Sequence, residues 1–191
     1  MKKGLVTLEN DKKIKIVGDI YEKVHHANNE YLDYWIENTF LHWDFWLSLA
    51  LTLLPWILFI QFRKKESTNR LLFVGLFVII FASWLDFLGV VCGLWYYTGK
   101  VVPTIPSYMP WDFCILPVFV MFLIQYKPDM KAYWKGLFFA SVGSFIGEPL
   151  FKWLGFYVAI HWNKFYSFPI YFLLFMVCHR LSKVKHFEPI K

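Results

Sequence analysis

Five apolar segments separated by polar and charged stretches follow one another along the chain after residue 42. They cover residues 43–62, 71–94, 111–126, 133–154 and 165–181. A helix needs about 20 predominantly apolar residues to cross the hydrocarbon core of a bilayer, and most of these segments are near that length. The third segment is the shortest and would recruit flanking residues. The pattern predicts an all-α, polytopic membrane helix bundle with about five transmembrane helices.

The stretch before the first segment has a different pattern. From Ile14 to Phe40, apolar residues recur mostly at steps of three and four with acidic residues between them, which predicts an amphipathic helix. Such a helix would lie on the membrane or on the bundle, and a soluble helical extension fits the same pattern. We therefore expect a polar tail and amphipathic helix over residues 1–42, a transmembrane bundle over 43–181 and a basic tail over 182–191.

Lysine and arginine are concentrated in alternate connections between the predicted spans. The richer connections follow the first, third and fifth spans and hold Arg63, Lys64, Lys65, Arg70, Lys127, Lys131, Lys135, Arg180, Lys183, Lys185 and Lys191. The other two connections hold Lys100, Lys152 and Lys164. Basic loops remain cytoplasmic, and most lysines of the N-terminal tail are too distant from the first span to count. We expect a cell-membrane protein with its N-terminus outside and its C-terminus in the cytoplasm.

Tryptophans gather at the outer ends of the predicted spans: Trp43, Trp46, Trp95, Trp111, Trp153 and Trp162. Amphipathic tryptophan rings are enriched at membrane–water interfaces, so we expect these residues to mark the outer interface. The connection over residues 95–110 contains three prolines and several aromatic residues, and it is expected to cap the bundle from outside.

Composition agrees with a membrane protein and disfavours other classes. Hydrophobic residues make up 58% of the chain, aromatic residues 22%, and the mean hydropathy is +0.42, which lies outside the norm for soluble domains. The formal net charge of +6 does not come from one basic stripe interleaved with aromatic residues, so we expect no nucleic-acid partner. Membrane lipid is the expected partner, and a homo-oligomer is compatible with the sequence.

The cysteines and histidines form no metal-ligand or cofactor motif. Three scattered cysteines make no disulfide framework, and the chain contains no phosphate-binding loop or nucleophile elbow. We therefore expect neither a metal nor a cofactor. Cys92 and Cys114 would lie near one membrane face, which leaves a bridge between them open, but unpaired cysteines among apolar neighbours are the preferred interpretation.

Four of the five apolar segments carry an acidic residue inside or at an edge: Asp44, Asp86, Asp112 and Glu148. An aspartate at the centre of a membrane helix costs about 2.5–3.5 kcal/mol, so such residues mark a site or a specific packing contact. In the predicted topology all four lie toward the outer side, with Asp86 and Glu148 deeper than the other two. With Trp95 at the mouth, they predict an acid-lined cavity that opens outward.

Three segments also present faces of small or polar residues beside these acids. The faces are Asp44, Ser48, Thr52 and Pro55; Ala82, Asp86, Gly89 and Gly93; and Gly136, Ala140, Gly143 and Gly147. Small residues let helices approach closely in lipid, so we expect these faces to turn inward. The alternative is that the acids, with no basic residue beside the inner ones, are protonated groups that specify packing. For Asp44 and Asp112, helix N-capping is the leading explanation.

Short motifs from the second span onward resemble a family of small multi-spanning membrane proteins of spore-forming Firmicutes. The motifs are Asp86, Gly93-Leu94-Trp95-Tyr96, Pro103, Pro106, Asp112, Pro117, Gln125-Tyr126, Trp134 and Glu148-Pro149. The family has no assigned reaction. The resemblance therefore implies localisation and architecture, and no chemistry.

A second set of residues is similar to the membrane-embedded lycopene cyclase domains of carotenoid synthesis. There, a Gly-x-Trp-x-Tyr stretch leads through a proline-containing loop to a helix that opens with paired carboxylates. Gly93, Trp95 and Tyr97 match the stretch, and Pro110-Trp111-Asp112 approximates the start of the helix. Phe113 follows Asp112, so the acidic pair is absent, and the alkene protonation that the resemblance implies lacks half of that pair.

Three functions are compatible with these observations. We expect a non-enzymatic integral membrane protein that binds a lipid or small molecule in the outer-side cavity, with Asp86 and Glu148 as its central polar groups. One alternative is a membrane enzyme that acts on an isoprenoid or lipid, with Glu148 or Asp86 as general acid. The other is a small proton- or cation-coupled transporter, which the lack of a convincing internal inverted repeat disfavours.

Overall fold

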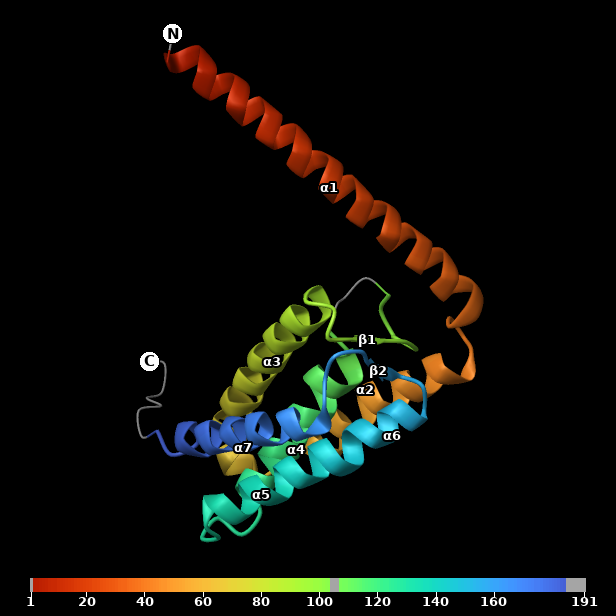
Figure 1. Cartoon of the computed structure of the whole chain (residues 1–191). Coiled ribbons are helices and arrows are strands. Elements are labelled where there is room, and N and C mark those ends of the chain that lie inside the picture. Colours follow the sequence, from red (N-terminus) through yellow and green to blue (C-terminus); the bar gives the residue numbers. More distant parts are fainter. Residues whose placement is uncertain (1, 104–106, 185–191) are drawn as a thin grey trace. The chain divides into compact units, whose positions relative to one another are not determined.

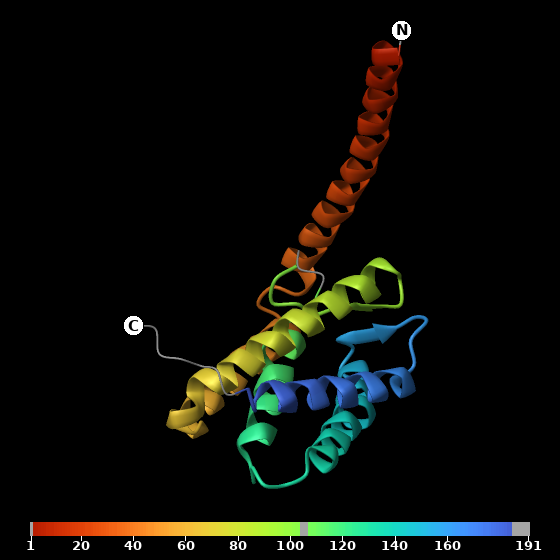
Figure 2. The same cartoon turned by 90° about the vertical axis from the view of Figure 1, so that its left-hand side faces the viewer.

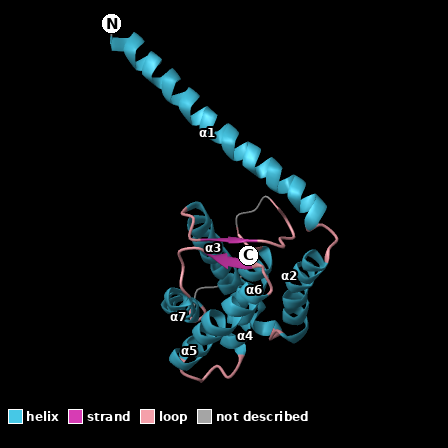
Figure 3. Ribbon diagram, turned by 45° about the vertical axis from the view of Figure 1, so that its right-hand side comes forward, coloured by secondary structure: helices cyan, strands magenta, loops and turns pink. Residues whose placement is uncertain are grey.

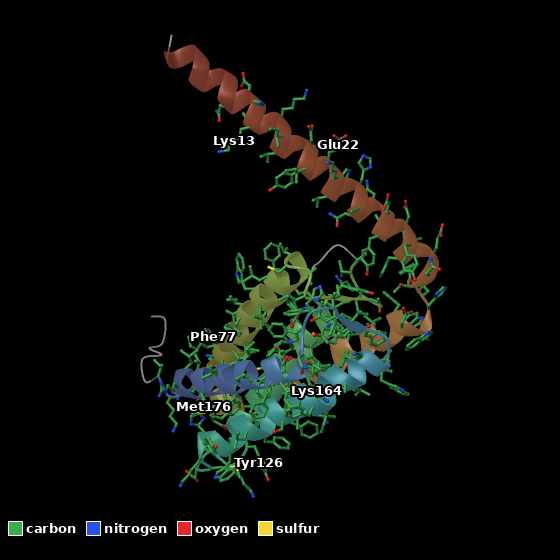
Figure 4. All side chains as sticks on the ribbon, in the orientation of Figure 1. Lys13, Glu22, Phe77, Tyr126, Lys164 and Met176 are labelled. Atoms are coloured by element: carbon green, nitrogen blue, oxygen red, sulfur yellow. The ribbon has the colours of Figure 1, made fainter. Side chains whose placement is uncertain are left out.

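The computed structural model describes residues 2–103 and 107–184. The chain forms two units, residues 1–40 and 41–191. The first unit is one helix, α1 (Lys2–Asn38), which begins well before Ile14, where the sequence pattern places its start. Side chains such as Lys13 and Glu22 project from it (Figure 4). The apolar residues between Ile14 and Val24 are 41–72% exposed.

The second unit is built from helices joined by short connections (Figures 1 and 2). Its elements are α2 (Trp43–Phe62), η1 (Lys65–Ser67), α3 (Thr68–Val91), β1 (Trp95–Tyr97), η2 (Pro110–Ile115), α4 (Leu116–Gln125), α5 (Ala132–Val142), η3 (Gly143–Gly147), α6 (Glu148–Trp153), β2 (Tyr157–Ala159) and α7 (Lys164–Leu181). The described residues are mostly helical, which confirms the all-α prediction. Each predicted apolar segment forms a helical run, because η2 continues into α4 and η3 joins α5 to α6.

Two helical runs are long and apolar enough to cross a membrane: Trp43–Phe62 and Lys65–Val91. Only 17% and 33% of their most apolar windows are buried, unlike the core helices of a soluble protein. An uncovered apolar surface of this kind is typical of a helix that faces lipid or a partner. This criterion supports membrane association, and it does not confirm the count of five spans, because the other described helices are shorter or less apolar.

Helix α4 lies in the middle of the second unit, in contact with α2, α3, α5 and α7. The largest core cluster joins four of these helices and consists of Val74, Val78, Ala82, Leu116, Val120, Phe139, Leu174, Phe175 and Cys178. A second cluster, of Trp95, Tyr108, Phe151, Phe156 and Tyr157, contains aromatic residues alone and lies around the two strands. Burial of these apolar side chains stabilises the bundle. The polar side chains of the site lie at the end of the bundle that carries the two strands.

Prolines explain two wide helical turns in the bundle. Pro117 has no N–H to offer the carbonyl of Phe113 four residues earlier, so the helix widens, and the Leu116 N–H bonds to the carbonyl of Trp111. The Phe113 carbonyl accepts the indole N–H of Trp56 instead, at 3.0 Å. Pro149 similarly follows the wide turn η3. The sequence alone indicates that such prolines free a carbonyl that needs a partner, and for Pro117 the partner lies on α2.

Replacing Trp56 with phenylalanine is expected to destabilise the protein by about 1 kcal/mol, because the Phe113 carbonyl loses its partner. In a Pro117→Ala background the same change should be smaller, since the restored N–H can reach that carbonyl. The measurement is a double-mutant cycle from denaturant unfolding in detergent micelles. Equal destabilisation in both backgrounds would show that the indole hydrogen bond does not compensate for the proline.

Helices α3 and α6 end in the same way. Gly93 and Gly155 have φ angles of +67° and +79°, a left-handed conformation that glycine adopts without strain. The next residues, Leu94 and Phe156, donate their N–H groups to the carbonyls of Gly89 and Phe151, at 2.9 Å in each case. Both helices therefore end in a Schellman motif, which turns the chain back across the bundle.

A short strand follows each of these two helix ends. Strands β1 and β2 pair antiparallel, with Tyr96 opposite Val158 at the centre (Figure 3). Asp86 precedes Gly93 by seven residues, and Glu148 precedes Gly155 by seven. The order acid, left-handed glycine, strand thus occurs twice, and the two strands pair with each other. Neither this ribbon nor this repeat is among the sequence-based expectations.

Candidate binding cavity

A cavity of about 50 Å³ lies where α3, α6 and α7 meet the strands. The residues that line it are Leu85, Asp86, Trp95, Tyr97, Tyr108, Trp111, Glu148, Phe151, Tyr157, Trp162, Ser167, Ile170 and Tyr171. A neighbouring cavity of about 40 Å³ shares Asp86, Tyr97, Trp111 and Tyr171 with it and reaches Asp112. Such volumes hold a few groups the size of water. We call the first cavity the aromatic–acid cavity.

Asp86 is buried and accepts hydrogen bonds from the following strand. Its Oδ1 accepts the indole N–H of Trp95 at 3.1 Å and the hydroxyl of Tyr97 at 2.8 Å. Alternate residues of a strand lie on the same face, so β1 delivers both donors to one carboxyl group. Burial, together with nearby Asp86 and Asp112, raises the pKa of the Tyr97 hydroxyl well above its ordinary value. The hydroxyl therefore remains a donor at physiological pH.

Asp112 lies directly behind Asp86. Its Oδ2 accepts the backbone N–H of Tyr108 at 3.0 Å, and a hydrogen bond joins its carboxyl group to that of Asp86. Lys100 is within electrostatic range of both groups, and its own pKa is lowered by burial. A basic residue therefore accompanies the inner acids, contrary to the sequence-based expectation.

Glu148 accepts hydrogen bonds from two hydroxyl groups, each of which accepts a hydrogen bond from a tryptophan. Its carboxyl group is hydrogen-bonded to the hydroxyls of Ser167 and Tyr171. Ser167 accepts the indole N–H of Trp162 at 2.8 Å, and Tyr171 accepts that of Trp111 at 3.1 Å. An indole N–H can only donate, so the single hydrogen of each hydroxyl points onward to Glu148. Glu148 therefore accepts a hydrogen bond from each of the two hydroxyls.

Glycines make room for two of these aromatic rings. A Cβ at Gly89 would lie 2.0 Å from the Trp95 ring, and one at Gly147 would lie 2.3 Å from the Trp111 ring. These distances are too short for any side chain larger than hydrogen. From the sequence, we expect these faces of small residues to pack against the backbone of a neighbouring helix. At Gly89 and Gly147 they pack against tryptophan rings instead. Gly93 of the same predicted face instead ends α3.

Three of the five residues expected at the site, Asp86, Glu148 and Trp95, line the aromatic–acid cavity. Asp112 contacts Asp86 and lines the neighbouring cavity. Asp44 lines neither: it lies in the first turn of α2, where its Oδ1 accepts the N–H of Phe45 at 3.1 Å. His42 occupies the N-cap position of α2, so Asp44 interacts with the positive end of the helix without being its cap.

Sequence reasoning missed the hydroxyl and indole donors of the cavity, namely Tyr97, Trp111, Trp162, Ser167 and Tyr171. The tryptophans of the predicted outer interface divide into two groups. Trp43, Trp46 and Trp153 are 54–80% exposed, whereas Trp95, Trp111 and Trp162 bond inward. The signal in the sequence was a glycine at the end of an apolar segment, followed by an aromatic stretch. This order is typical of a helix end that leads into a strand.

The cysteines are unpaired, as preferred from the sequence. Cys92 is exposed and Cys114 is buried, and both are free thiols, so no bridge joins them. Within residues 2–103 and 107–184, no group of three or more histidine, cysteine, aspartate or glutamate side chains could hold a metal ion. The chemistry of the cavity therefore rests on carboxyl groups, hydroxyls and aromatic rings.

Searches with protein-family models, among curated proteins and among solved structures found no match to this chain.

Proposed function

We propose that this protein is a multi-pass membrane protein that binds the ammonium group of a lipid or lipid-like molecule in the aromatic–acid cavity. The composition of the lining supports this most directly. Asp86 and Glu148 both face the cavity, aromatic rings form most of its remaining surface, and none of the described lining residues is basic. Tryptophan and tyrosine faces attract ammonium groups, and a nearby carboxylate adds a counter-charge.

The proposed setting is the cell membrane, crossed about five times, with the N-terminus outside and the C-terminus in the cytoplasm. Exposed apolar side chains on the later helices support the additional spans. Phe138 and Ile146, on α5 and η3, are 54% and 60% exposed, and Leu173 on α7 is 61% exposed. Monomeric soluble proteins rarely expose large contiguous apolar surfaces, so these helices need lipid or a partner around them.

Charge balance favours Glu148 as the group that pairs with the ligand. Asp86 already interacts with Asp112, and Lys100 lies near both. Glu148 is hydrogen-bonded to the neutral hydroxyls of Ser167 and Tyr171, with Lys164 within electrostatic range. A carboxylate away from bulk water is stabilised by an opposite charge, which an ammonium group in the cavity would supply. Asp86 would contribute a weaker attraction from the opposite side.

The hydrogen-bond directions favour binding over general-acid catalysis. An acid catalyst must direct its own proton toward the substrate. Glu148 instead accepts from Ser167 and Tyr171, and the Oδ1 atom of Asp86 accepts from Trp95 and Tyr97. Both carboxyl groups are thus arranged to attract positive charge rather than to donate a proton.

Replacing Glu148 with glutamine is expected to weaken binding of dodecyltrimethylammonium about 10–30-fold, equivalent to about 1.4–2 kcal/mol. Glutamine keeps the shape and one acceptor oxygen while it removes the counter-charge. The measurement is native mass spectrometry of protein purified in a maltoside detergent and titrated with the amphiphile. Glu66→Gln, on η1 away from the cavity, is the matched control and should bind like the parent.

Equal binding by the parent and the Glu148→Gln protein would contradict the proposal. Native spectra of the untitrated parent add a second readout, since a co-purified lipid lost in the Glu148→Gln protein would occupy the same site. An amphiphile that binds both variants equally is held by apolar surface alone.

A further inference from the structure

A second, wider cavity adjoins the aromatic–acid cavity. It has a volume of about 290 Å³ and shares Glu148, Tyr157 and Trp162 with the first. The residues found only in its lining are Pro149, Lys152, Ala159, Asn163 and Lys164. We call it the lysine vestibule. The two cavities meet at Glu148, so a ligand held by Glu148 would extend into the vestibule.

The two cavities separate charge of opposite sign. Asp86 lines only the aromatic–acid cavity of the two, Glu148 lies where they meet, and both lysines, Lys152 and Lys164, line only the vestibule. Lys152 follows Glu148 by four residues on α6, which places the two on the same side of the helix. Lys164 comes from the start of α7 (Figure 4) and is near enough to Glu148 to affect its charge. A ligand that spans both cavities would have negative groups beside its inner end and positive groups beside its outer end.

Exposed apolar side chains lie close in sequence to both lysines of the vestibule. Leu150 and Trp153, which flank Lys152 on α6, are 46% and 80% exposed, and Phe165 and Tyr166, which follow Lys164, are 63% and 58% exposed. Exposed apolar residues beside lysines are typical of the boundary between lipid tails and headgroups, where long lysine side chains reach the polar layer. This favours a ligand that has an acyl chain over a free solute.

We propose that the two cavities together bind the headgroup of a zwitterionic phospholipid, with its ammonium group beside Glu148 and its phosphate between Lys152 and Lys164. This rests on the proposed function, because the ammonium site is the one described above. The two-carbon spacer of such a headgroup places opposite charges on neighbouring positions, as the acids and lysines of the cavities require. Lysine ammonium groups are suitable phosphate partners because they act as compact point charges.

The test compares the parent with a Lys152→Gln/Lys164→Gln protein in native mass spectrometry titrations. The probes are lauroyl lysophosphatidylcholine and dodecyltrimethylammonium, which share the quaternary ammonium and a twelve-carbon chain, and free phosphocholine. Both lysines are exposed, so the fold should be unaffected. The exposed pair Lys127→Gln/Lys131→Gln, in the connection between α4 and α5, is the control of equal charge.

The parent is expected to bind the lysophospholipid about 10-fold more tightly than dodecyltrimethylammonium. The Lys152→Gln/Lys164→Gln change should weaken lysophospholipid binding about 5–10-fold and leave dodecyltrimethylammonium binding unchanged or tighter, because only the phosphate loses partners. The control pair should alter neither. Free phosphocholine should bind far more weakly than the lysophospholipid, for lack of the acyl chain.

Two results would overturn the inference while the proposed function stands. One is Glu148-dependent dodecyltrimethylammonium binding with no effect of the vestibule lysines on the lysophospholipid. The other is free phosphocholine binding as tightly as the lysophospholipid, which would assign the site to a soluble zwitterion. Failure of both amphiphiles to depend on Glu148 would instead overturn the proposed function itself.

Discussion

Replacing Asp86 with leucine is expected to destabilise the protein by about 2–5 kcal/mol, because two buried donors lose their acceptor at about 1–3 kcal/mol each. The donors are the indole N–H of Trp95 and the hydroxyl of Tyr97. The Tyr108 N–H remains bonded to Asp112 at 3.0 Å and adds little. Leucine also leaves Asp112 without its carboxyl partner.

Asparagine at the same position is expected to cost about 1 kcal/mol or less, since it retains an acceptor oxygen for both donors. Its amide can also donate to the carboxyl group of Asp112. The measurement is the unfolding midpoint in detergent for the parent, Asp86→Asn and Asp86→Leu. Equal stability of the two variants would contradict the hydrogen bonds to Asp86, and a collapse of folded Asp86→Asn protein would show that both acids are ionised.

The position of the acids could be predicted from the sequence because it depends on helix ends. Asp86 and Glu148 each precede the end of an apolar segment that runs in the same direction, so a weaving chain brings them to one side. Periodicity also places Asp86 on the buried face of α3 with Ala82 and Gly89. These inferences need only the length and direction of helices, which hydropathy records well.

The hydrogen-bond partners of the acids could not be predicted in the same way. Trp95 and Tyr97 reach Asp86 only because Gly93 turns the chain and β1 pairs with β2, a contact between distant parts of the sequence. The relays to Glu148 depend on how α7 packs against η3. Hydropathy treats tryptophan and tyrosine as apolar or interfacial residues, and it does not record where their N–H and O–H groups point.

The acid–glycine–strand repeat escaped detection because most of its positions differ in sequence. The strands Trp95–Tyr97 and Tyr157–Ala159 have no identical residue at corresponding positions, and both merely begin with an aromatic residue. The two copies share their geometry: each has a left-handed glycine and a Schellman hydrogen bond, and their strands pair with Tyr96 opposite Val158. Both copies run from a helix through a left-handed glycine to a strand, and the two strands pair antiparallel.

The repeat also shows why the second acid has an open cavity beside it. Tyr97 and Ala159 each occupy the last position of their strand, four residues after the left-handed glycine. In the first copy the Tyr97 hydroxyl donates to Asp86. In the second copy Ala159 has no such group, and it lines the vestibule next to Glu148. The vestibule thus lies where the first copy has a tyrosine side chain.

Replacing Ala159 with tyrosine is therefore expected to weaken binding of both amphiphiles about 100-fold or more, because the bulky ring would block the ligand's path to Glu148. The fold should be preserved, since the vestibule of about 290 Å³ has room for the ring and tyrosine favours strands. Val158→Tyr is the matched control, because adjacent strand residues face opposite sides and Val158 lines neither cavity. The measurements are the native mass spectrometry titrations and the unfolding midpoint. A stably folded Ala159→Tyr protein that binds lysophospholipid like the parent would show that ligands do not enter beside Glu148.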